Sequence, residues 1–160
     1  MIVVLMGVSG SGKTTVGKLL AEKLAWPFAD ADEFHPATNI EKMRGGSPLT
    51  DDNRRPWLRS LREFIDDVAD RDGNLVLACS ALSHDYRQYL TADNSQHVRY
   101  VYLQGSEELI AKRLAERKGH FMPPILLRSQ FETLEPPHDA IRVDITPPPE
   151  AITDKIIRAL

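Results

Sequence analysis

The segment GVSGSGKT, from Gly7 to Thr14, constrains the fold of this chain more than any other stretch. It fits the pattern G-x-x-x-x-G-K-[ST], in which glycines permit a tight turn and successive backbone N–H groups point inward at a phosphate. The apolar run Ile2–Met6 precedes it and is typical of a strand buried on both faces. Apolar residues after Thr14 fall on one helical stripe, so the positive end of a helix would also face the phosphate. The sequence therefore predicts a strand, a phosphate-binding loop and a helix, in that order.

Two side chains of this loop carry distinct chemistry. Lys13 is expected to reach the β- and γ-phosphates of a nucleoside triphosphate as a point charge, and the Thr14 hydroxyl to ligate Mg²⁺. An ordinary glycine-rich turn would not require a lysine and a hydroxyl at these positions. We therefore expect ATP to bind here together with Mg²⁺.

Short apolar runs alternate with helical patterns along the rest of the chain. Further strands are predicted at 28–29, 75–79, 98–103 and 141–145, and helices at 51–71, 84–90, 107–117 and from 149 onward. Thr50 is expected to cap the long helix, with Pro56 in its first turn. Such alternation implies parallel strands joined by right-handed crossovers, with ligands at the carboxyl ends of the strands. A chain of 160 residues is expected to form a single α/β domain, residues 1–160.

Polar clusters follow the predicted strands. Asp30 and Asp32 stand on the same side of the strand end, so one carboxylate can hold the magnesium shell while the other accepts a proton from an attacking hydroxyl. The segment from 35 to 58 contributes cations that form either an anion pocket or a solvated helix face: His35, Lys42, Arg44, Arg54 and Arg55. Ser80 and Arg87 follow a third strand and are expected to face the same site.

A basic helix end lies further along the chain. Arg113 and Arg117 are four residues apart on one helical face, and Lys118, Gly119 and His120 follow them. They form either an exposed basic terminus favoured by the helix dipole or a lid that closes over the γ-phosphate and excludes water. The glycine and the prolines after it favour the lid.

Composition limits the partners. The formal net charge of −3 argues against a nucleic-acid partner, because there is no basic excess to neutralise backbone phosphates. Cys79 is the only cysteine, so no intrachain disulfide can form, and a reducing compartment is favoured. The start MIVVLMG has no charged leader and is too short to span a bilayer. We expect a cytoplasmic protein without a membrane partner.

Taken in order, these motifs resemble the gluconokinase family of small P-loop kinases, which are related to shikimate and adenylate kinases. The resemblance rests on GVSGSGKT, DADEFHPATNIEKMRGGSPLTDDNRRPWL, CSALSHDYR, RLAERKGHFMPPILLRSQFETLEPP and VDI. It runs from Ile2 to about the last helix, and the second and fourth blocks are more specific than the P-loop. It implies a three-layer α/β fold with a five-stranded parallel sheet in the order 2-3-1-4-5 and a lid at about 117–137. Pro123 and Pro124 are expected to stiffen the lid connection or to move its helix start.

The resemblance also implies an activity: ATP and D-gluconate give ADP and 6-phospho-D-gluconate, with Mg²⁺, in a homodimer. The implied ATP-binding residues are Gly7, Val8, Ser9, Gly10, Ser11, Gly12, Lys13, Thr14, Thr15, Arg113 and Arg117. The implied substrate-binding residues are Asp32, His35, Arg54, Tyr86, Arg87 and Lys118. Lys13, Asp32 and Arg117 would be catalytic, and Thr14 and Asp30 would serve the metal, although Asp30 and Asp32 could exchange roles.

Two alternatives remain open from the sequence. Another small hydroxy acid such as shikimate could be the acceptor, since arginines recognise any carboxylate. A nucleotide-gated binding protein without transfer activity is the second alternative, and it would not need an aspartate as base.

Overall fold

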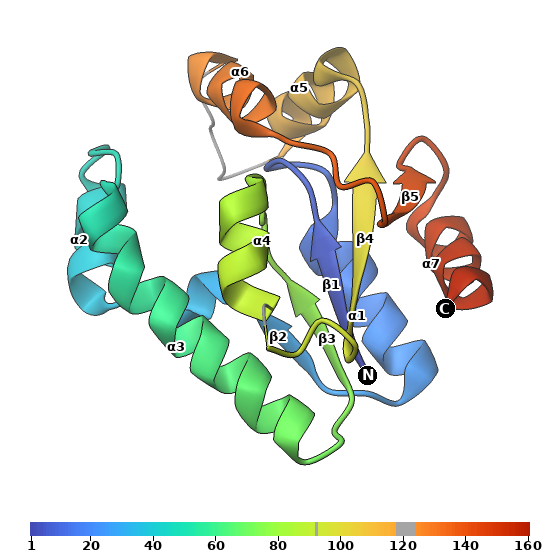
Figure 1. The fold of residues 1–160 in the computed structure, drawn as a ribbon. Helices are drawn as coiled ribbons and strands as arrows, with labels where there is room; N and C mark the ends of the chain where they lie inside the picture. The colour runs from blue at the N-terminus through green and yellow to red at the C-terminus, as the bar shows by residue number, and fades with distance from the viewer. Residues whose placement is uncertain (92, 118–123) are drawn as a thin grey trace.

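The computed structural model describes residues 1–91, 93–117 and 124–160. A parallel five-stranded sheet in the order β2-β3-β1-β4-β5 forms its centre (Figure 1). The strands are β1 (Ile2–Met6), β2 (Phe28–Asp30), β3 (Leu75–Ala78), β4 (Val98–Gln104) and β5 (Ile141–Asp144). The α/β fold class and the strand order expected from the resemblance are confirmed.

The central strand β1 is buried on both faces, as its apolar run predicts. Ile2, Val4 and Met6 belong to one apolar cluster, whereas Val3 and Leu5 belong to a second one on the other face. This division follows from the period of two along a strand. The sheet therefore needs helices on both sides to cover it.

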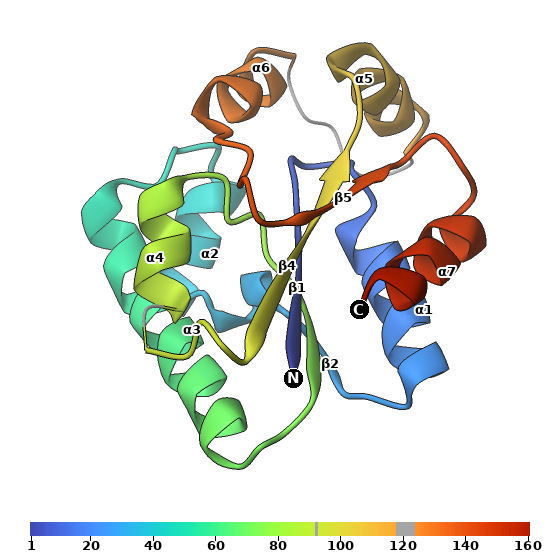
Figure 2. The same ribbon diagram turned by 45° about the vertical axis from the view of Figure 1, so that its right-hand side comes forward.

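Helices cover both faces of the sheet (Figures 1 and 2). The first cluster contains residues of α3 (Asp51–Asp70) and α4 (His84–Thr91), and the second contains residues of α1 (Lys13–Leu24) and α7 (Pro149–Ala159). Beyond the carboxyl ends of the strands lie α5 (Glu107–Glu116) and α6 (Pro124–Thr133). A short 3-10 helix (Ala31–Phe34) and α2 (Ala37–Arg44) connect β2 to α3. This arrangement places the polar strand ends in a space bordered by α3, α5 and α6.

The predicted helices are confirmed with small differences at two prolines. Thr50 caps α3, and its side chain and that of Asn53 form a reciprocal capping box. Pro56 lies beyond the first turn, not within it, because the helix already begins at Asp51. Of the predicted lid, the structure describes Arg117 and residues 124–137, where α6 begins at Pro124.

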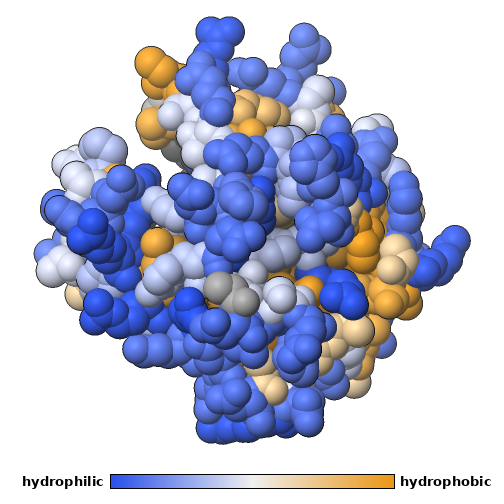
Figure 3. All heavy atoms as spheres, in the orientation of Figure 1, coloured by the Kyte–Doolittle hydropathy of each residue, from blue (hydrophilic) through white to orange (hydrophobic). Residues whose placement is uncertain are grey.

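The outer surface is mainly hydrophilic in the view of Figure 3, with an apolar group over the tip of α6. Ile125 and Leu126 of this helix are 76% and 50% exposed. None of the helices in the three described ranges is long and apolar enough to cross a membrane.

Candidate active site

The loop between β1 and α1 has the conformation of a phosphate cradle. Gly7, Gly10 and Gly12 adopt positive φ angles of 149°, 81° and 95°, which other residues rarely adopt. Helix α1 begins at Lys13 directly after Gly12, and no side chain caps it. The backbone N–H groups of its first turn are therefore available to an anion, and the helix dipole favours negative charge at this point.

Lys13 lies across the loop. Its Nζ donates hydrogen bonds to the carbonyl oxygens of Gly7 and Val8, both at 3.0 Å. Burial lowers the pKa of the Lys13 ammonium, while the carboxylate of Asp32 opposes this effect. Phosphate oxygens are stronger hydrogen-bond acceptors than carbonyl oxygens. The Lys13 ammonium would therefore bind a phosphate in place of the two carbonyls.

A buried hydroxyl supports an anion ligand at the same loop. Ser11 is 1% exposed, and its Oγ has no hydrogen-bond partner within the described part of the chain. A buried hydroxyl without a partner is unfavourable by roughly 1–3 kcal/mol. The residues present therefore fit a phosphate group better than they fit an empty, purely structural turn.

The aspartate pair divides into two environments. Asp30 accepts a hydrogen bond from the Thr14 hydroxyl at 3.0 Å and another from the backbone N–H of Asp32 at 3.1 Å. Burial raises the pKa of Asp32, with Asp30 adding to the rise and with His35 and Lys13 opposing it. The carboxylate of Asp30 thus lies with the P-loop threonine, and that of Asp32 has a pKa above the ordinary aspartate value.

No group of three or more His, Cys, Asp or Glu side chains converges on a metal position within residues 1–91, 93–117 and 124–160. A hydroxyl and one carboxylate, here Thr14 and Asp30, are the protein groups that a phosphate-bound Mg²⁺ requires, because its other ligands are water and phosphate oxygens. The donor set therefore fits Mg²⁺ and does not fit a structural zinc site.

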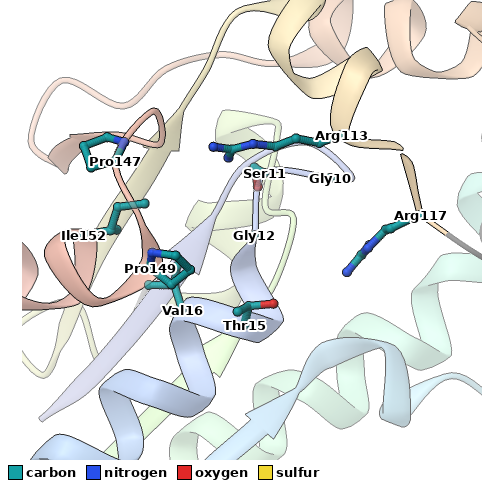
Figure 4. Close-up of a pocket in the computed structure, with 10 residues that line it drawn as sticks. All are labelled: Gly10, Ser11, Gly12, Thr15, Val16, Arg113, Arg117, Pro147, Pro149 and Ile152. Atoms are coloured by element: carbon teal, nitrogen blue, oxygen red, sulfur yellow. The ribbon is translucent and has the colours of Figure 1, made fainter. Parts of the chain in front are cut away.

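Three adjoining cavities lie at the carboxyl ends of the strands, and two of them are lined by the P-loop. The first, of about 320 Å³, is lined by Gly10, Ser11, Gly12, Thr15, Val16, Arg113, Arg117, Pro147, Pro149 and Ile152 (Figure 4). Arg113 extends toward the segment that carries Pro147 and donates to the carbonyl of Ile145 at 2.7 Å, whereas Arg117 extends toward the start of α1. This cavity has a partly apolar wall and can accept the nucleoside portion of a nucleotide.

A second cavity of about 460 Å³ lies over the P-loop and is lined by Ser9, Gly10, Gly12, Lys13, Thr14, Asp30, Asp32, Ala78, Cys79, Ser80, Leu114 and Arg117. It shares Gly10, Gly12 and Arg117 with the nucleoside cavity. The two therefore form one continuous path, with cations of the P-loop and of α5 along it.

A third cavity of about 570 Å³, here called the acceptor cavity, meets the second one at Asp32 and Ser80. It is lined by Asp32, His35, Leu49, Asp51, Arg54, Trp57, Ser80, Ala81, Leu82, Ser83, Asp85, Tyr86, Ser129, Gln130 and Thr133. Four predicted substrate-binding residues are thus brought together: Asp32, His35, Arg54 and Tyr86. A volume of this size suits a small polar molecule.

Two arrangements shape the wall of the acceptor cavity. The His35 ring stacks on Trp57 with ring centroids 4.7 Å apart, and the indole N–H of Trp57 donates to the carbonyl of Ala31 at 2.6 Å. Arg54 donates from one nitrogen to Tyr86 Oη and to Asp51, both at 3.4 Å. Because these contacts of Arg54 are long, its guanidinium can turn to a carboxylate ligand without losing strong bonds.

Arg87 does not join this group. It is buried, and its guanidinium donates to the carbonyls of Ala81, Leu82 and Glu135 at 2.8, 3.0 and 2.8 Å. It lines a separate cavity between α4 and the segment after α6, and does not line the acceptor cavity. The guanidinium is held by three backbone carbonyls and joins two chain segments, so the structure does not support the expected contact of Arg87 with substrate. Lys118, also expected at the substrate, lies outside the described residues.

Comparison with known proteins identifies the family. The family model described as "Shikimate kinase" matches residues 9–137. A gluconokinase of Gluconobacter oxydans is 43% identical, covering 97% of this chain and 88% of its own length. The thermosensitive gluconokinase of Escherichia coli is 42% identical, covering 98% of this chain and 86% of its own. The crystal structure of a gluconokinase from Sinorhizobium meliloti superposes with a TM-score of 0.86, at 43% identity over 98% of this chain and 89% of that one. This chain belongs to the gluconokinase family.

Membership of the gluconokinase family, a group of ATP-dependent P-loop kinases related to shikimate kinase, confirms the resemblance on which the sequence interpretation rested. The sequence interpretation missed Gln130 of α6. Its Oε1 accepts from the backbone N–H of Ser9 at 2.7 Å, and its Nε2 donates to Ser9 Oγ at 3.2 Å. Because Gln130 also lines the acceptor cavity, it joins that cavity to the P-loop. Its place in the family-specific block SQFETLE was the one signal available for it.

Proposed function

We propose that this protein transfers the γ-phosphoryl group of ATP to the 6-hydroxyl of D-gluconate, giving ADP and 6-phospho-D-gluconate. The observation that carries the proposal is the junction of the acceptor cavity with the phosphate cavity at Asp32 and Ser80. A hydroxyl at this junction would lie between a basic carboxylate and the P-loop. The names of the relatives, which are gluconokinases, select gluconate among small acceptors.

Asp32 is proposed as the base. Its carboxylate accepts the proton of the 6-hydroxyl while the hydroxyl oxygen bonds to the γ-phosphorus and the bond from that phosphorus to the ADP oxygen breaks. Partial desolvation at the strand ends and the neighbouring Asp30 raise the pKa of Asp32, which makes it a stronger base than an isolated aspartate in water. Asp30 takes the metal-side role because it already accepts from Thr14.

Charge stabilisation is assigned to the cations. Lys13 and Arg117 neutralise the charge that develops on the transferring group, and Arg113 borders the nucleoside cavity. Bound Mg²⁺, held through Thr14 and the shell of Asp30, would neutralise the β- and γ-phosphate oxygens. Lys118 remains a predicted lid cation.

Recognition of gluconate is assigned to the acceptor cavity. The guanidinium of Arg54 suits the carboxylate, because a planar fork of donors matches two carboxylate oxygens. His35 and Tyr86 border the same space and can bond to hydroxyl groups of the polyol chain. Arg87 is left out of this set.

The test is ADP release from Mg·ATP by the purified protein with D-gluconate, shikimate, other sugar acids, AMP or no acceptor. We expect stimulation by D-gluconate, with one phosphate on its 6-hydroxyl. Asp32→Asn should abolish the stimulation, and Asp70→Asn, an exposed carboxyl at the end of α3, should not. Stimulation by shikimate alone would keep the kinase chemistry and discard the substrate, and ATP binding without any stimulation would favour a nucleotide-gated binding protein.

We also propose that the protein is a cytoplasmic homodimer. The proposal extends the family resemblance and the single buried cysteine, Cys79, which suits a reducing compartment. Light scattering on the purified protein tests the assembly, and a monomeric mass across the working concentration range would contradict it.

A further inference from the structure

A buried asparagine contacts the histidine of the acceptor cavity. Asn39 of α2 is 3% exposed. Its Nδ2 donates to the backbone carbonyl of Asn53 at 2.8 Å and lies 3.3 Å from Nδ1 of His35. Asn39 does not line the acceptor cavity and is not part of the P-loop. Burial of its amide is unfavourable unless the amide is hydrogen-bonded, so its two contacts explain why it is buried.

The carbonyl of Asn53 determines how the Asn39 amide is oriented. A carbonyl oxygen can only accept, so the group at 2.8 Å from it must be the NH₂ and not the amide oxygen. The same NH₂ faces Nδ1 of His35, and an NH₂ group can only donate. Nδ1 must therefore be the unprotonated, accepting nitrogen of the ring, and a neutral His35 carries its proton on Nε2.

The ring plane is fixed independently of this contact. His35 stacks on Trp57 at an interplanar angle of 13°, and the Trp57 indole is itself anchored to the carbonyl of Ala31. A 180° flip of the ring within this plane would put Cδ2 in the place of Nδ1 and would break the bond with Asn39. Nε2 lies on the opposite side of the imidazole from the Asn39 contact, on a residue that lines the acceptor cavity.

We propose that Asn39 is a positioning residue that holds His35 in the neutral Nε2–H tautomer, so that the imidazole donates a hydrogen bond to an oxygen of the acceptor. The hydrogen bond from His35 to the acceptor rests on the proposed function. The tautomer of His35 rests only on the contacts of Asn39. A fixed donor here would discriminate in favour of acceptors with an oxygen at this position, since a missing partner would leave the donor unsatisfied.

The charges around His35 are consistent with a neutral ring. Burial lowers the pKa of His35, and Arg54 of α3 lowers it further, while Asp32 raises it. Protonation at Nδ1 would also set an N–H against the NH₂ of Asn39. As pH falls, a charged His35 would therefore require loss of the Asn39 contact.

The decisive measurement is the ¹⁵N spectrum of the histidine side chains in the full, substrate-free protein across about pH 6 to 8. The signal of His35 is assigned by its absence in His35→Gln. We expect a pyrrole-type Nε2 and a pyridine-type Nδ1 in the neutral ring, with a titration midpoint below that of an ordinary histidine. An Nδ1–H tautomer, or an imidazolium at neutral pH, would overturn the proposal without bearing on the kinase activity.

A variant adds a functional readout. Asn39→Asp places a carboxylate against Nδ1 and should raise the pH midpoint of His35 titration by about one unit or more. It should also raise the KM for D-gluconate about 3- to 10-fold, with a smaller effect on the KM for ATP. Asn74→Asp is the charge-matched control, because Asn74 is exposed and its side-chain oxygen accepts a hydrogen bond from the terminal ammonium group of Met1, away from the acceptor cavity. An unchanged His35 midpoint in folded Asn39→Asp would refute the positioning role, and the wild-type spectrum decides the tautomer if that variant does not fold.

Discussion

The contact between Gln130 and the P-loop leads to a prediction whose size follows from the structure. Gln130→Ala removes two hydrogen bonds to Ser9, one to its backbone N–H at 2.7 Å and one to its hydroxyl at 3.2 Å. A typical internal hydrogen bond contributes about 0.5–1.5 kcal/mol, so the pair contributes about 1–3 kcal/mol to holding Ser9 in place. Without these bonds the free loop would lose this order and ATP would have to restore it on binding, so the change should weaken ATP binding about 5- to 150-fold.

The variant Ser9→Ala distinguishes the contributions of the two hydrogen bonds. It removes the hydroxyl and keeps the bond from the backbone N–H to Gln130, so ATP binding should weaken only about 2- to 12-fold. The fold should survive both changes, because Leu127 remains buried and anchors α6. Glu132→Gln, on an exposed position of the same helix, is the control and should leave ATP binding unchanged.

Isothermal titration of each variant with Mg·ATP, together with thermal unfolding, measures these effects. Unchanged or tighter ATP binding by Gln130→Ala would refute the reasoning, because it would mean that the two bonds do not prepare the loop for the nucleotide. A loss of ATP binding accompanied by a large fall in Tm would assign Gln130 to the stability of the fold instead.

Three shorter predictions concern single side chains. Lys13→Met should lower kcat by about two to three orders of magnitude in the ADP-release assay, and a wild-type kcat would exclude Lys13 from charge stabilisation. Arg87→Ala should lower the free energy of unfolding by more than about 3 kcal/mol, because three carbonyls lose their donor; a stable variant with a raised KM for D-gluconate would instead return Arg87 to the substrate. Trp57→Phe keeps a ring beside His35 but deprives the Ala31 carbonyl of its partner, so urea unfolding should show a loss of about 1–3 kcal/mol, and no loss would mean that another donor replaces the indole.

Much of the fold could be predicted from local patterns. The alternation of Ile2, Val4 and Met6 with Val3 and Leu5 determines a strand covered on both faces, because side chains on a strand alternate strictly. The α/β class and parallel sheet then followed from the order of strands and helices. The position of Pro56 was predicted less well, since capping by Thr50 already starts the helix at Asp51, before the proline.

The P-loop could be predicted from sequence because its chemistry lies in eight consecutive residues, Gly7 to Thr14, whose spacing alone fixes which backbone groups face a phosphate. The division of labour between Asp30 and Asp32 could not be predicted from their alternation. It depends on which carboxylate meets Thr14 and on which charged groups surround Asp32, and both are properties of the packed chain.

The tertiary structure alone decided the contacts between distant segments. Ser9 and Gln130 are 121 residues apart, and only the packing of α6 over the strand ends brings them together. The sequence does not show whether the Arg87 guanidinium binds substrate or backbone. In the structure it donates to the carbonyls of the turn after β3. The sequence by itself determined the fold class and the phosphate cradle, because those depend on neighbours along the chain. The structure decided the acceptor cavity, because its wall is assembled from four separate segments whose side-chain directions depend on how the helices pack.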